Sequence, residues 1–461
     1  MNFISMEFLI FFPIVLLICR KLPAGTHQVF ILIVSYFFYM NGISWIGLLL
    51  FFSTAVSWTA ARQIARASGQ AEKKVWLVAV CLYCLICLLF FKRKDFLVPG
   101  ISFYMFQALS YVLDVYGKKS ESEPVFYRYA LYVSFFPQLA AGPIERARDL
   151  LPQLKKPVMI KGRHISDGLW LMLRGFFKKL AVADYLAAYV SMVYDAPGQA
   201  GGLAAVIATL FFAVQIYCDF SGYTDIARGA ARMLGIELME NFDHPYRAAN
   251  MQEFWRRWHI SLTKWLTDYL YIPLGGSRKG FFCTCRNRMA VFALSGLWHG
   301  LSWHYVVWGL LHGIFLSVWH ITRHFLNGRN KNSGPVGRLR VHLSRFATFS
   351  AVCFAWIFFR AESLSDAWIL LGQMFFHFME VRPVQLLLFF QMSGLDLLRL
   401  FLVLLCLFLL EKLPDVPDSI RLPGQAAAAA FFVYCIGTVT LLSWLAVLAQ
   451  NGGNTFIYFL F

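Results

Sequence analysis

Two histidines, each preceded by a tryptophan, are the residues of this chain best suited to chemistry. His259 lies in EFWRRWHISLTKWLTDYLYIPLGGSRKG, and His299 follows 40 positions later in LSGLWHGLSWHYVVWGLLHG. Histidine readily takes and returns a proton near neutral pH. No Asp, Glu, Lys or Arg occurs from Met289 to Trp319, so His299 suits the hydrocarbon region, where an ionisable group marks a candidate functional site. The pair predicts acid–base chemistry inside a membrane.

The alternative interpretation of such histidines is structural. A lone histidine in an apolar helix is more often packed and hydrogen-bonded than catalytic, and helix periodicity alone leaves His304, His312 and His320 in that class. A zinc site is the other alternative. The sequence contains no HExxH, no pair of separate CxxC motifs and no His-carboxylate set at ligand spacing, so no metal site is predicted.

The segment around His259 has the pattern of an amphipathic helix. On a continuous helix His259 shares an apolar face with Trp255, Leu262 and Leu266. The opposite face carries charge pairs four residues apart, namely Glu253 with Arg257 and Lys264 with Asp268. Such a helix fits a headgroup region or the wall of a polar cavity better than a lipid-exposed span. Pro273 and three glycines then predict a break between residues 271 and 280.

The segment around His299 forms either one long apolar helix or two broken ones. If the helix is continuous from Leu297, His299 shares a face with Trp303, Val306 and Leu310. The spacing of His259 and His299 in the sequence does not show whether the two residues lie close together in the fold.

The composition places these segments in a polytopic membrane protein. Of the 461 residues, 59% are hydrophobic and only 15% are charged, and apolar and basic segments alternate along the chain. This alternation leaves no room for a large soluble domain, so residues 1–461 are predicted to form one membrane-embedded domain. The net charge of +17 is spread over the loops, which indicates an anionic membrane surface and not nucleic acid.

About eleven membrane spans are predicted, some of them short or re-entrant. Arg20 and Lys21 follow the first apolar run and are expected in the cytoplasm. Residues 321–345 hold six arginines and lysines without an acid, which predicts a cytoplasmic loop. Further apolar stretches are expected at about 28–41, 43–60, 75–91, 100–116, 125–140, 169–193, 202–218, 346–360, 366–379, 383–393, 397–412 and 425–449.

Three polar features have two interpretations each. Asp219 and Asp225 bound a polar block after residues 202–218, where they fit either helix caps or a lining of the reaction site. Cys283 and Cys285 lie in a basic loop, where lipidation or an acyl relay competes with an inert role. A basic run follows Pro143 and fits either the positive-inside rule or attraction of an anionic donor. Its members are Arg146, Arg148, Lys155, Lys156, Lys161 and Arg163.

The two histidine blocks resemble those of the membrane-bound O-acyltransferases, in the branch typified by the bacterial alginate O-acetylase. The resemblance continues in the same order through GISFYMFQALSYVLDVYG, SFFPQLAAGPIERARDLLPQL, GFFKKLAVAD, YCDFSGYTDIARGAARMLGIELMENFDHPYRAANMQEFW, FAWIFFRAESLSDAW and the terminal FIYFLF. These motifs span nearly the whole chain. The resemblance implies an all-α bundle with a central tunnel and a catalytic core at about residues 134–320.

The resemblance also implies roles for single residues. His299 matches the invariant active-site histidine of the superfamily, and His259 matches a polar residue about 40 positions upstream. In the family these two face one another across a tunnel where an acyl thioester meets a hydroxyl. Residues implied as candidates for the tunnel lining are Asp219, Ser221, Tyr223, Asp225, Trp255, Arg256, Trp258, Trp298 and Trp303.

The expected activity is O-acetylation of a cell-envelope or exported polysaccharide from cytoplasmic acetyl-CoA, by a multi-pass protein of a bacterial plasma membrane. His299 is expected to act as general base, and His259 to position the thioester carbonyl or stabilise the oxyanion. No tightly bound cofactor is expected. Alternatives are D-alanyl transfer to teichoic acid, a transporter or flippase, or a subunit that hands acetyl groups to an extracytoplasmic SGNH-type transferase.

Overall fold

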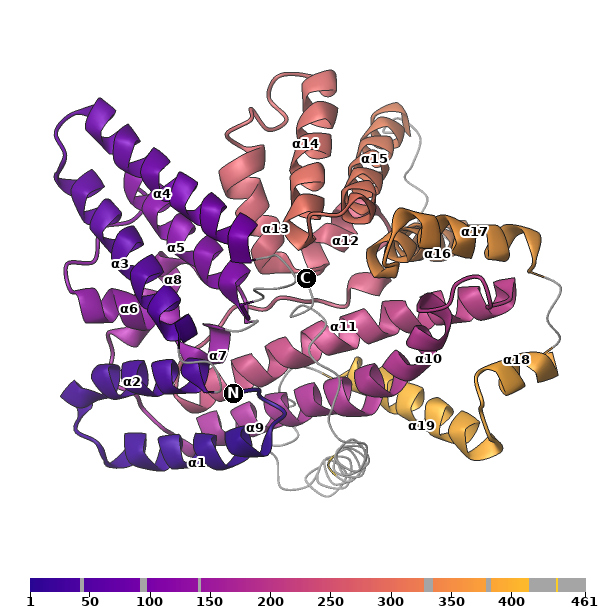
Figure 1. The fold of residues 1–461 in the computed structure, drawn as a ribbon, viewed down its shortest axis with the longest axis horizontal. Helices are drawn as coiled ribbons and strands as arrows, with labels where there is room; N and C mark the ends of the chain where they lie inside the picture. The colour runs from indigo at the N-terminus through magenta and orange to yellow at the C-terminus, as the bar shows by residue number, and fades with distance from the viewer. Residues whose placement is uncertain are drawn as a thin grey trace.

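The computed structural model describes residues 1–41, 45–91, 98–139, 142–326, 335–378, 383–413 and position 437. Throughout these ranges the regular secondary structure is helical, and no strand occurs in them (Figure 1). The expected all-α class is therefore confirmed for the described part of the chain.

The N-terminal third forms a group of packed helices, at the left in Figure 1. Most are apolar, and Gly117 follows the last residue of α5. They are α1 Met6–Lys21, α2 His27–Met40, α3 Trp45–Arg66, α4 Gln70–Phe91, α5 Ile101–Tyr116, α6 Phe126–Ser134, α7 Phe136–Leu139 and α8 Ala147–Leu154.

The remaining helices surround a long central pair, α9 and α11. A π-helical segment, η3, joins α9 to α10. The bounds are α9 Gly162–Phe176, η3 Phe177–Ala183, α10 Asp184–Tyr194, α11 Gly202–Met233, α12 Met251–Arg257, α13 Ile260–Leu266, η5 Thr267–Tyr271, α14 Phe281–His299, α15 Trp303–Leu326, α16 Pro335–Arg360, α17 Leu364–Phe376, α18 Pro383–Phe389 and α19 Gly394–Leu410.

Glycines let α9 and α11 cross at close range. A Cβ atom added to Gly222 would lie 2.8 Å from the carbonyl oxygen of Gly175, and one added to Gly229 would lie 2.5 Å from that of Gly168. Small residues at such crossings allow membrane helices to pack backbone against backbone. Helix α11 also contacts His259, because the ring of Phe220 lies 4.7 Å from that of His259, centroid to centroid.

Helix α11 corrects one expectation about the polar block. Asp219 and Asp225 do not cap a span, because α11 continues through them to Met233. The helix is able to carry these carboxylates in its interior because basic side chains from the neighbouring α9 and η3 neutralise them.

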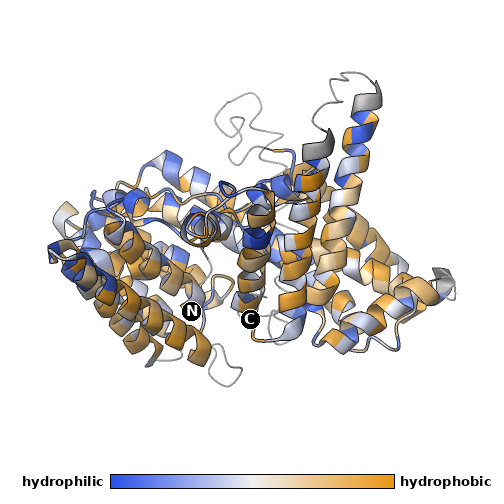
Figure 2. Ribbon diagram, turned by 90° about the horizontal axis from the view of Figure 1, so that it is seen from above, coloured by the Kyte–Doolittle hydropathy of each residue, from blue (hydrophilic) through white to orange (hydrophobic). Residues whose placement is uncertain are grey.

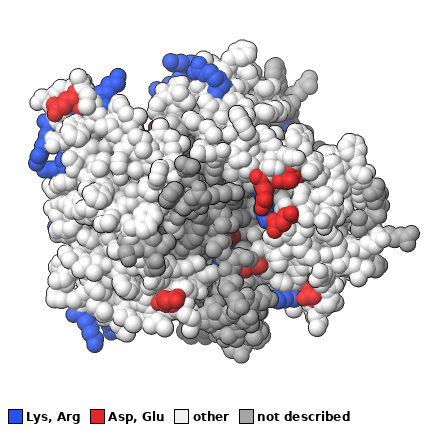
Figure 3. All heavy atoms as spheres, viewed as in Figure 1, with Lys and Arg blue, Asp and Glu red and all other residues white. Residues whose placement is uncertain are grey.

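Four helices of the described ranges are long and apolar enough to cross a membrane, namely α4, α11, most of α15 and most of α16. Figure 3 shows one largely uncharged face, on which the Lys and Arg atoms lie mostly near the rim and acidic groups also lie right of the centre. Figure 2 shows that apolar residues predominate along most helices. The chain is thus a multi-pass membrane protein. The predicted total of about eleven spans is not confirmed, and the span expected at 425–449 lies outside the described ranges.

Two loop predictions have different outcomes. The break after Tyr271 is confirmed, because η5 ends there, α14 begins at Phe281, and Gly275, Gly276 and Gly280 all have positive φ. The loop expected at 321–345 is shorter than predicted, because α15 extends to Leu326 and α16 begins at Pro335. Most of the basic residues expected in the loop thus lie on the ends of the two helices. A membrane helix is able to extend beyond the hydrocarbon region, where its charged end lies among the headgroups.

Candidate active site

His259 lies at a sharp bend between α12 and α13, and not on a continuous helix as expected. Its backbone has φ 44°, in the left-handed region, and its side chain is 1% exposed. A left-handed conformation is uncommon for a residue other than glycine, and such strain concentrates at functional sites. The bend reorients α13 relative to α12, so His259 does not share one helical face with both Trp255 and Leu262.

Asn241 holds this bend in place. Its backbone carbonyl accepts a hydrogen bond from the N–H of Ile260 at 3.0 Å, and its side-chain oxygen lies 3.3 Å from Nδ1 of His259. The carbonyl of His259 then accepts the first bond of α13, from Thr263 at 2.9 Å. The residue was not identified from the sequence, because a single asparagine 18 positions upstream carries no local signal.

His299 is the last residue of α14 and is 3% exposed. Its ring packs against Trp308 and Phe359, each with a centroid distance of 5.0 Å. The chain breaks at Gly300 and resumes as α15 at Trp303. Of the two arrangements considered from the sequence, the structure therefore has two broken helices, which removes the predicted shared face of His299 and Trp303.

One indole contacts both imidazoles. The ring centroid of Trp298 lies 6.3 Å from that of His259 and 4.7 Å from that of His299. Phe103 of α5 packs against both Trp298 and His259, at 6.2 Å from each. Segments 40 residues apart thus bring the two histidines into one buried aromatic cluster, where interactions with developing charge are strong because water is excluded.

The other candidates for the tunnel lining divide into two groups. The buried ones are Asp219, Ser221, Tyr223, Asp225, Trp255 and Trp258, and Trp298 is partly buried. Two do not join them, because Trp303 is 71% exposed and Arg256 is exposed. Trp303 begins a new helix after the break at Gly300, and Arg256 turns away from the buried face of α12. A place for either residue in the tunnel lining stays a prediction.

His304 and His312 behave as packed histidines. Nδ1 of His304 lies 3.1 Å from the carbonyl oxygen of Phe358, and Nδ1 of His312 accepts a hydrogen bond of 3.3 Å from the indole N–H of Trp255. Both rings are buried. Their hydrogen bonds are those expected of structural residues.

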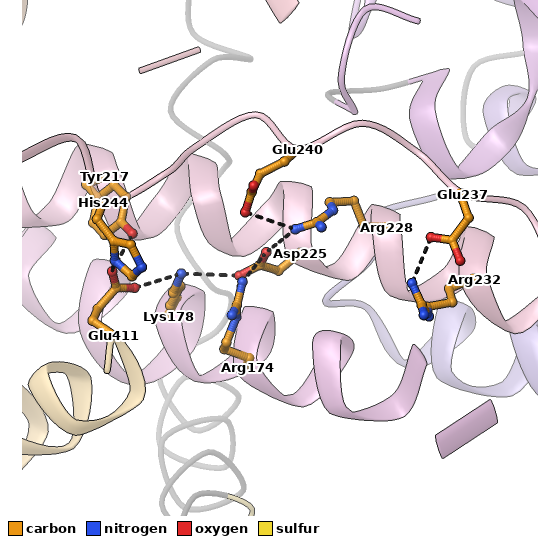
Figure 4. Close-up of polar contacts among 10 residues, drawn as sticks. All are labelled: Arg174, Lys178, Tyr217, Asp225, Arg228, Arg232, Glu237, Glu240, His244 and Glu411. Carbon is orange, nitrogen blue, oxygen red and sulfur yellow. Dashed lines mark hydrogen bonds and ion pairs between the residues drawn. The ribbon is translucent and has the colours of Figure 1, made fainter. Parts of the chain in front are cut away.

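A buried charge network lies beside the site, on the side of Asn241 (Figure 4). Lys178 of η3 contacts Asp225 of α11 at 3.2 Å and Glu411, just beyond α19, at 3.1 Å. Glu411 also accepts a hydrogen bond from the hydroxyl of Tyr217 at 2.8 Å and lies 2.6 Å from Nδ1 of His244. Arg174 makes two bonds of 3.0 Å to Asp225.

The network is neutral and therefore differs from an anion-binding pocket. A small cavity of about 20 Å³, with room for about one water, is lined by Arg174, Lys178 and Arg228 together with Asp225, Glu240 and Glu411. Three cations balance three anions. The sequence signal for it was the adjacent lysines of GFFKKLAVAD within an apolar stretch, which were not assigned a role.

Glu145 and Arg146 form a second buried polar group. Glu145 accepts a hydrogen bond of 2.6 Å from the backbone N–H of Met239, and its burial raises the pKa of its carboxyl to about 7. Arg146 pairs with Asp268 at 3.1 Å and lies over the ring of Tyr269. Arg146 is thus part of the protein interior, whereas the sequence placed it in a basic run that fits either the positive-inside rule or attraction of an anionic donor.

In the described ranges no three His, Cys, Asp or Glu side chains gather as a metal site requires. Cys283 and Cys285 lie half-buried in the first turns of α14. A lipidation or relay role for them stays a prediction.

Comparisons with known proteins define the class. The family model of the membrane-bound O-acyltransferases matches residues 31–358. A peptidoglycan O-acetyltransferase of Helicobacter pylori is 34% identical over 386 residues, which cover 74% of this chain and 72% of the relative. A probable alginate O-acetylase of Azotobacter vinelandii is 34% identical over 400 residues, covering 81% and 78%. A teichoic acid D-alanyltransferase of Bacillus subtilis is 28% identical over 280 residues, covering 57% and 68%.

The chain therefore belongs to the membrane-bound O-acyltransferase family, and it is an O-acyltransferase. The predicted similarity to the alginate O-acetylase branch is confirmed as well, whereas the D-alanyltransferases are more distant.

Proposed function

We propose that this protein transfers acetyl groups from cytoplasmic acetyl-CoA for the O-acetylation of a cell-envelope or exported polysaccharide, in the plasma membrane of a bacterium. The observation that carries the proposal is the buried cluster in which Trp298 contacts both His259 and His299. The names of the relatives support an acetyl group and a glycan acceptor, since one acts on peptidoglycan and the other on alginate.

In the proposed reaction His299 acts as general base on an acceptor hydroxyl. The hydroxyl O–H bond breaks as its proton passes to the imidazole, and the oxygen attacks the thioester carbonyl. The C–S bond of the tetrahedral intermediate then breaks, and the proton passes to the departing thiolate. His259 positions the reacting groups. The rings around both histidines, among them Phe103, Trp308 and Phe359, keep water from competing with the acceptor.

The acceptor is either the polysaccharide itself or an extracytoplasmic SGNH-type transferase that passes the acetyl group on. In both cases the chemistry at the histidines is the same, because a hydroxyl attacks the thioester. D-alanyl transfer to teichoic acid is the second candidate, and the more distant relatives favour it less.

The test uses a deletion strain complemented with the wild-type chain or with His299→Ala. Base-released acetate and D-alanine are measured on isolated envelope glycans. We expect acetate to fall in the deletion strain, to return with the wild-type chain and to stay low with His299→Ala at equal membrane abundance. Loss of D-alanine instead of acetate, or full acetylation by His299→Ala, overturns the proposal. Purified protein in vesicles with radiolabelled acetyl-CoA identifies the donor, and no label transfer to acceptor or water counts against acetyl-CoA.

A further inference from the structure

The side chain of Asn241 gathers three donors on one oxygen. Its Oδ1 atom lies 3.1 Å from the backbone nitrogen of Ser261, 3.0 Å from the hydroxyl of Ser261 and 3.3 Å from Nδ1 of His259. Asn241 is fully buried. A buried amide oxygen with several donors is held in one orientation, because turning it would leave those donors facing an NH₂ group.

The backbone of Ser261 fixes which atom of the amide is the oxygen. Oxygen and nitrogen of an asparagine side chain are easily exchanged in assignment. However, the N–H of Ser261 only donates, so the atom facing it must be the acceptor. The same atom faces Nδ1 of His259, and that ring nitrogen must therefore carry the proton and donate it.

We infer that Asn241 is a positioning residue that locks neutral His259 in the tautomer with its proton on Nδ1, so that the ring acts in acyl transfer through the lone pair on Nε2. This inference rests on the proposed function, because it assigns a role within that reaction. The ring neighbours of His259 include Phe103, Phe220, Phe242 and Trp298, none of which carries a charge that would compete for control of the tautomer.

The tautomer of His259 bears on the two roles that the sequence left open for it, namely positioning the thioester carbonyl and stabilising the oxyanion. A lone pair on Nε2 accepts a hydrogen bond or a proton from a reacting group, as a base or an orienting residue requires. Stabilising an oxyanion requires an N–H directed at that oxygen, which Nε2 has only in the imidazolium. Asn241 thus favours the accepting role and disfavours the oxyanion role.

The side chain and the backbone of Asn241 do separate tasks, which makes the inference testable. The backbone carbonyl supports the left-handed bend through Ile260 and is unchanged by substitution. Only the side chain contacts the ring. Asn241→Leu removes the acceptor at similar size, and Asn241→Asp keeps an acceptor oxygen but adds a negative charge beside Nδ1. Ser261→Ala is the matched control, since it removes one donor from the same oxygen without touching His259.

The experiment measures kcat, KM for acetyl-CoA and the pH profile of acetyl transfer by purified protein in vesicles. With Asn241→Leu we expect kcat to fall on the order of 10²-fold with little change in KM, because wrong imidazole tautomers are costly in related base arrangements. With Asn241→Asp we expect the acid limb of kcat/KM to move up by about one pH unit or more. Ser261→Ala should stay within about threefold of the wild type, the range a lost neutral hydrogen bond suggests.

The outcomes separate the inference from the proposed function. A folded Asn241→Leu protein with wild-type kcat, an Asn241→Asp protein with an unmoved acid limb, or an active His259→Ala protein overturns the inference while acetyl transfer by the wild type stands. If the wild-type protein transfers no acetyl group from acetyl-CoA, the proposed function itself fails. Elution as a single species in detergent establishes folding. Should Asn241→Leu not fold, the pH profile of Asn241→Asp decides, since that variant keeps the acceptor for Ser261.

Discussion

The indole of Trp298 lies 6.3 Å from the imidazole of His259, centroid to centroid, with the two planes inclined at 61°. Trp298 is also the residue directly before His299, whose ring it meets at 4.7 Å. The indole therefore fixes His259 relative to the end of α14. Under the proposed mechanism the two histidines come from different helices and need such a shared neighbour, because small displacements of reacting groups lower the rate.

Replacement of His299 tests the proposed base. We expect His299→Ala to lower acetyl transfer by about 10²- to 10⁴-fold, the range typical of a lost general base. Thermal unfolding in detergent should change little. His304→Gln is the matched control, because His304 is also buried but bonds the carbonyl of Phe358. Equal losses of activity in the two variants would show that any buried histidine in this region matters only for packing.

The sequence identified the two histidines as candidate site residues, but it did not show how they come to lie in one cluster. The Trp-His pairs and the uncharged stretch after Met289 are local patterns, and they identified both residues. The bend at His259 depends on Asn241, which comes from a distant segment, so helical periodicity wrongly predicted a continuous helix. The ion pairs of Asp225 were not predicted for the same reason, because Arg174 and Lys178 reach it from other elements. Long-range partners of this kind leave no periodic signal.

Glu145 predicts a pH dependence of stability. Burial raises the pKa of its carboxyl from 4.5 to about 7. Between these two pH values the folded protein keeps the carboxyl proton, whereas the unfolded chain has lost it. Stability should therefore fall as pH rises from about 4.5 to 7 and stay reduced above that range, by about 3 kcal/mol at most. Glu145→Gln keeps an acceptor for Met239 and removes the charge. We expect the variant to gain thermal stability at pH 8 and to match the wild type near pH 4.5.

The control for this pH dependence is Glu237→Gln, which alters an exposed carboxylate paired with Arg232. Its unfolding temperature should follow that of the wild type at every pH. A Glu145→Gln protein that is no more stable than wild type at pH 8 would mean that Glu145 ionises in the fold at little cost.

The buried lysine of η3 predicts a large loss of stability. Lys178 is 2% exposed and contacts both Asp225 and Glu411, and it lowers the pKa of Glu411 even though burial alone would raise it. Lys178→Met removes a cation from buried Asp225 and from partly buried Glu411. We expect the free energy of unfolding to fall by about 3–5 kcal/mol, as when one partner of a buried pair is removed. Chemical denaturation in detergent measures it.

Two variants show whether the uncompensated charge causes that loss. Combining Lys178→Met with Glu411→Leu removes one of the two carboxylates that lost their cation. The double variant should therefore be more stable than Lys178→Met alone. Arg257→Met removes a half-exposed partner of Glu253, 2.9 Å away, and should cost about 1 kcal/mol or less. A double variant less stable than Lys178→Met alone would indicate that packing, and not charge, dominates at this position.

The close contact of α9 and α11 predicts that adding one methyl group, as in Gly222→Ala, destabilises the protein. A Cβ on Gly222 would lie 2.8 Å from the carbonyl oxygen of Gly175 and 3.0 Å from Cβ of Lys178, so Gly222→Ala must separate two helix backbones. Overpacking of this kind typically costs about 1–3 kcal/mol. The matched control is Gly372→Ala in α17, where nothing lies within 4 Å of the added atom. There the better helix propensity of alanine should raise stability by up to about 1 kcal/mol. Opposite shifts in unfolding temperature for the two variants are expected, and a harmless Gly222→Ala would mean that α9 and α11 are not held at backbone contact.

Because Lys178 faces Gly222, the same substitution should also weaken the contact of Lys178 with Glu411, and the loss of stability should be smaller when Lys178→Met is already present.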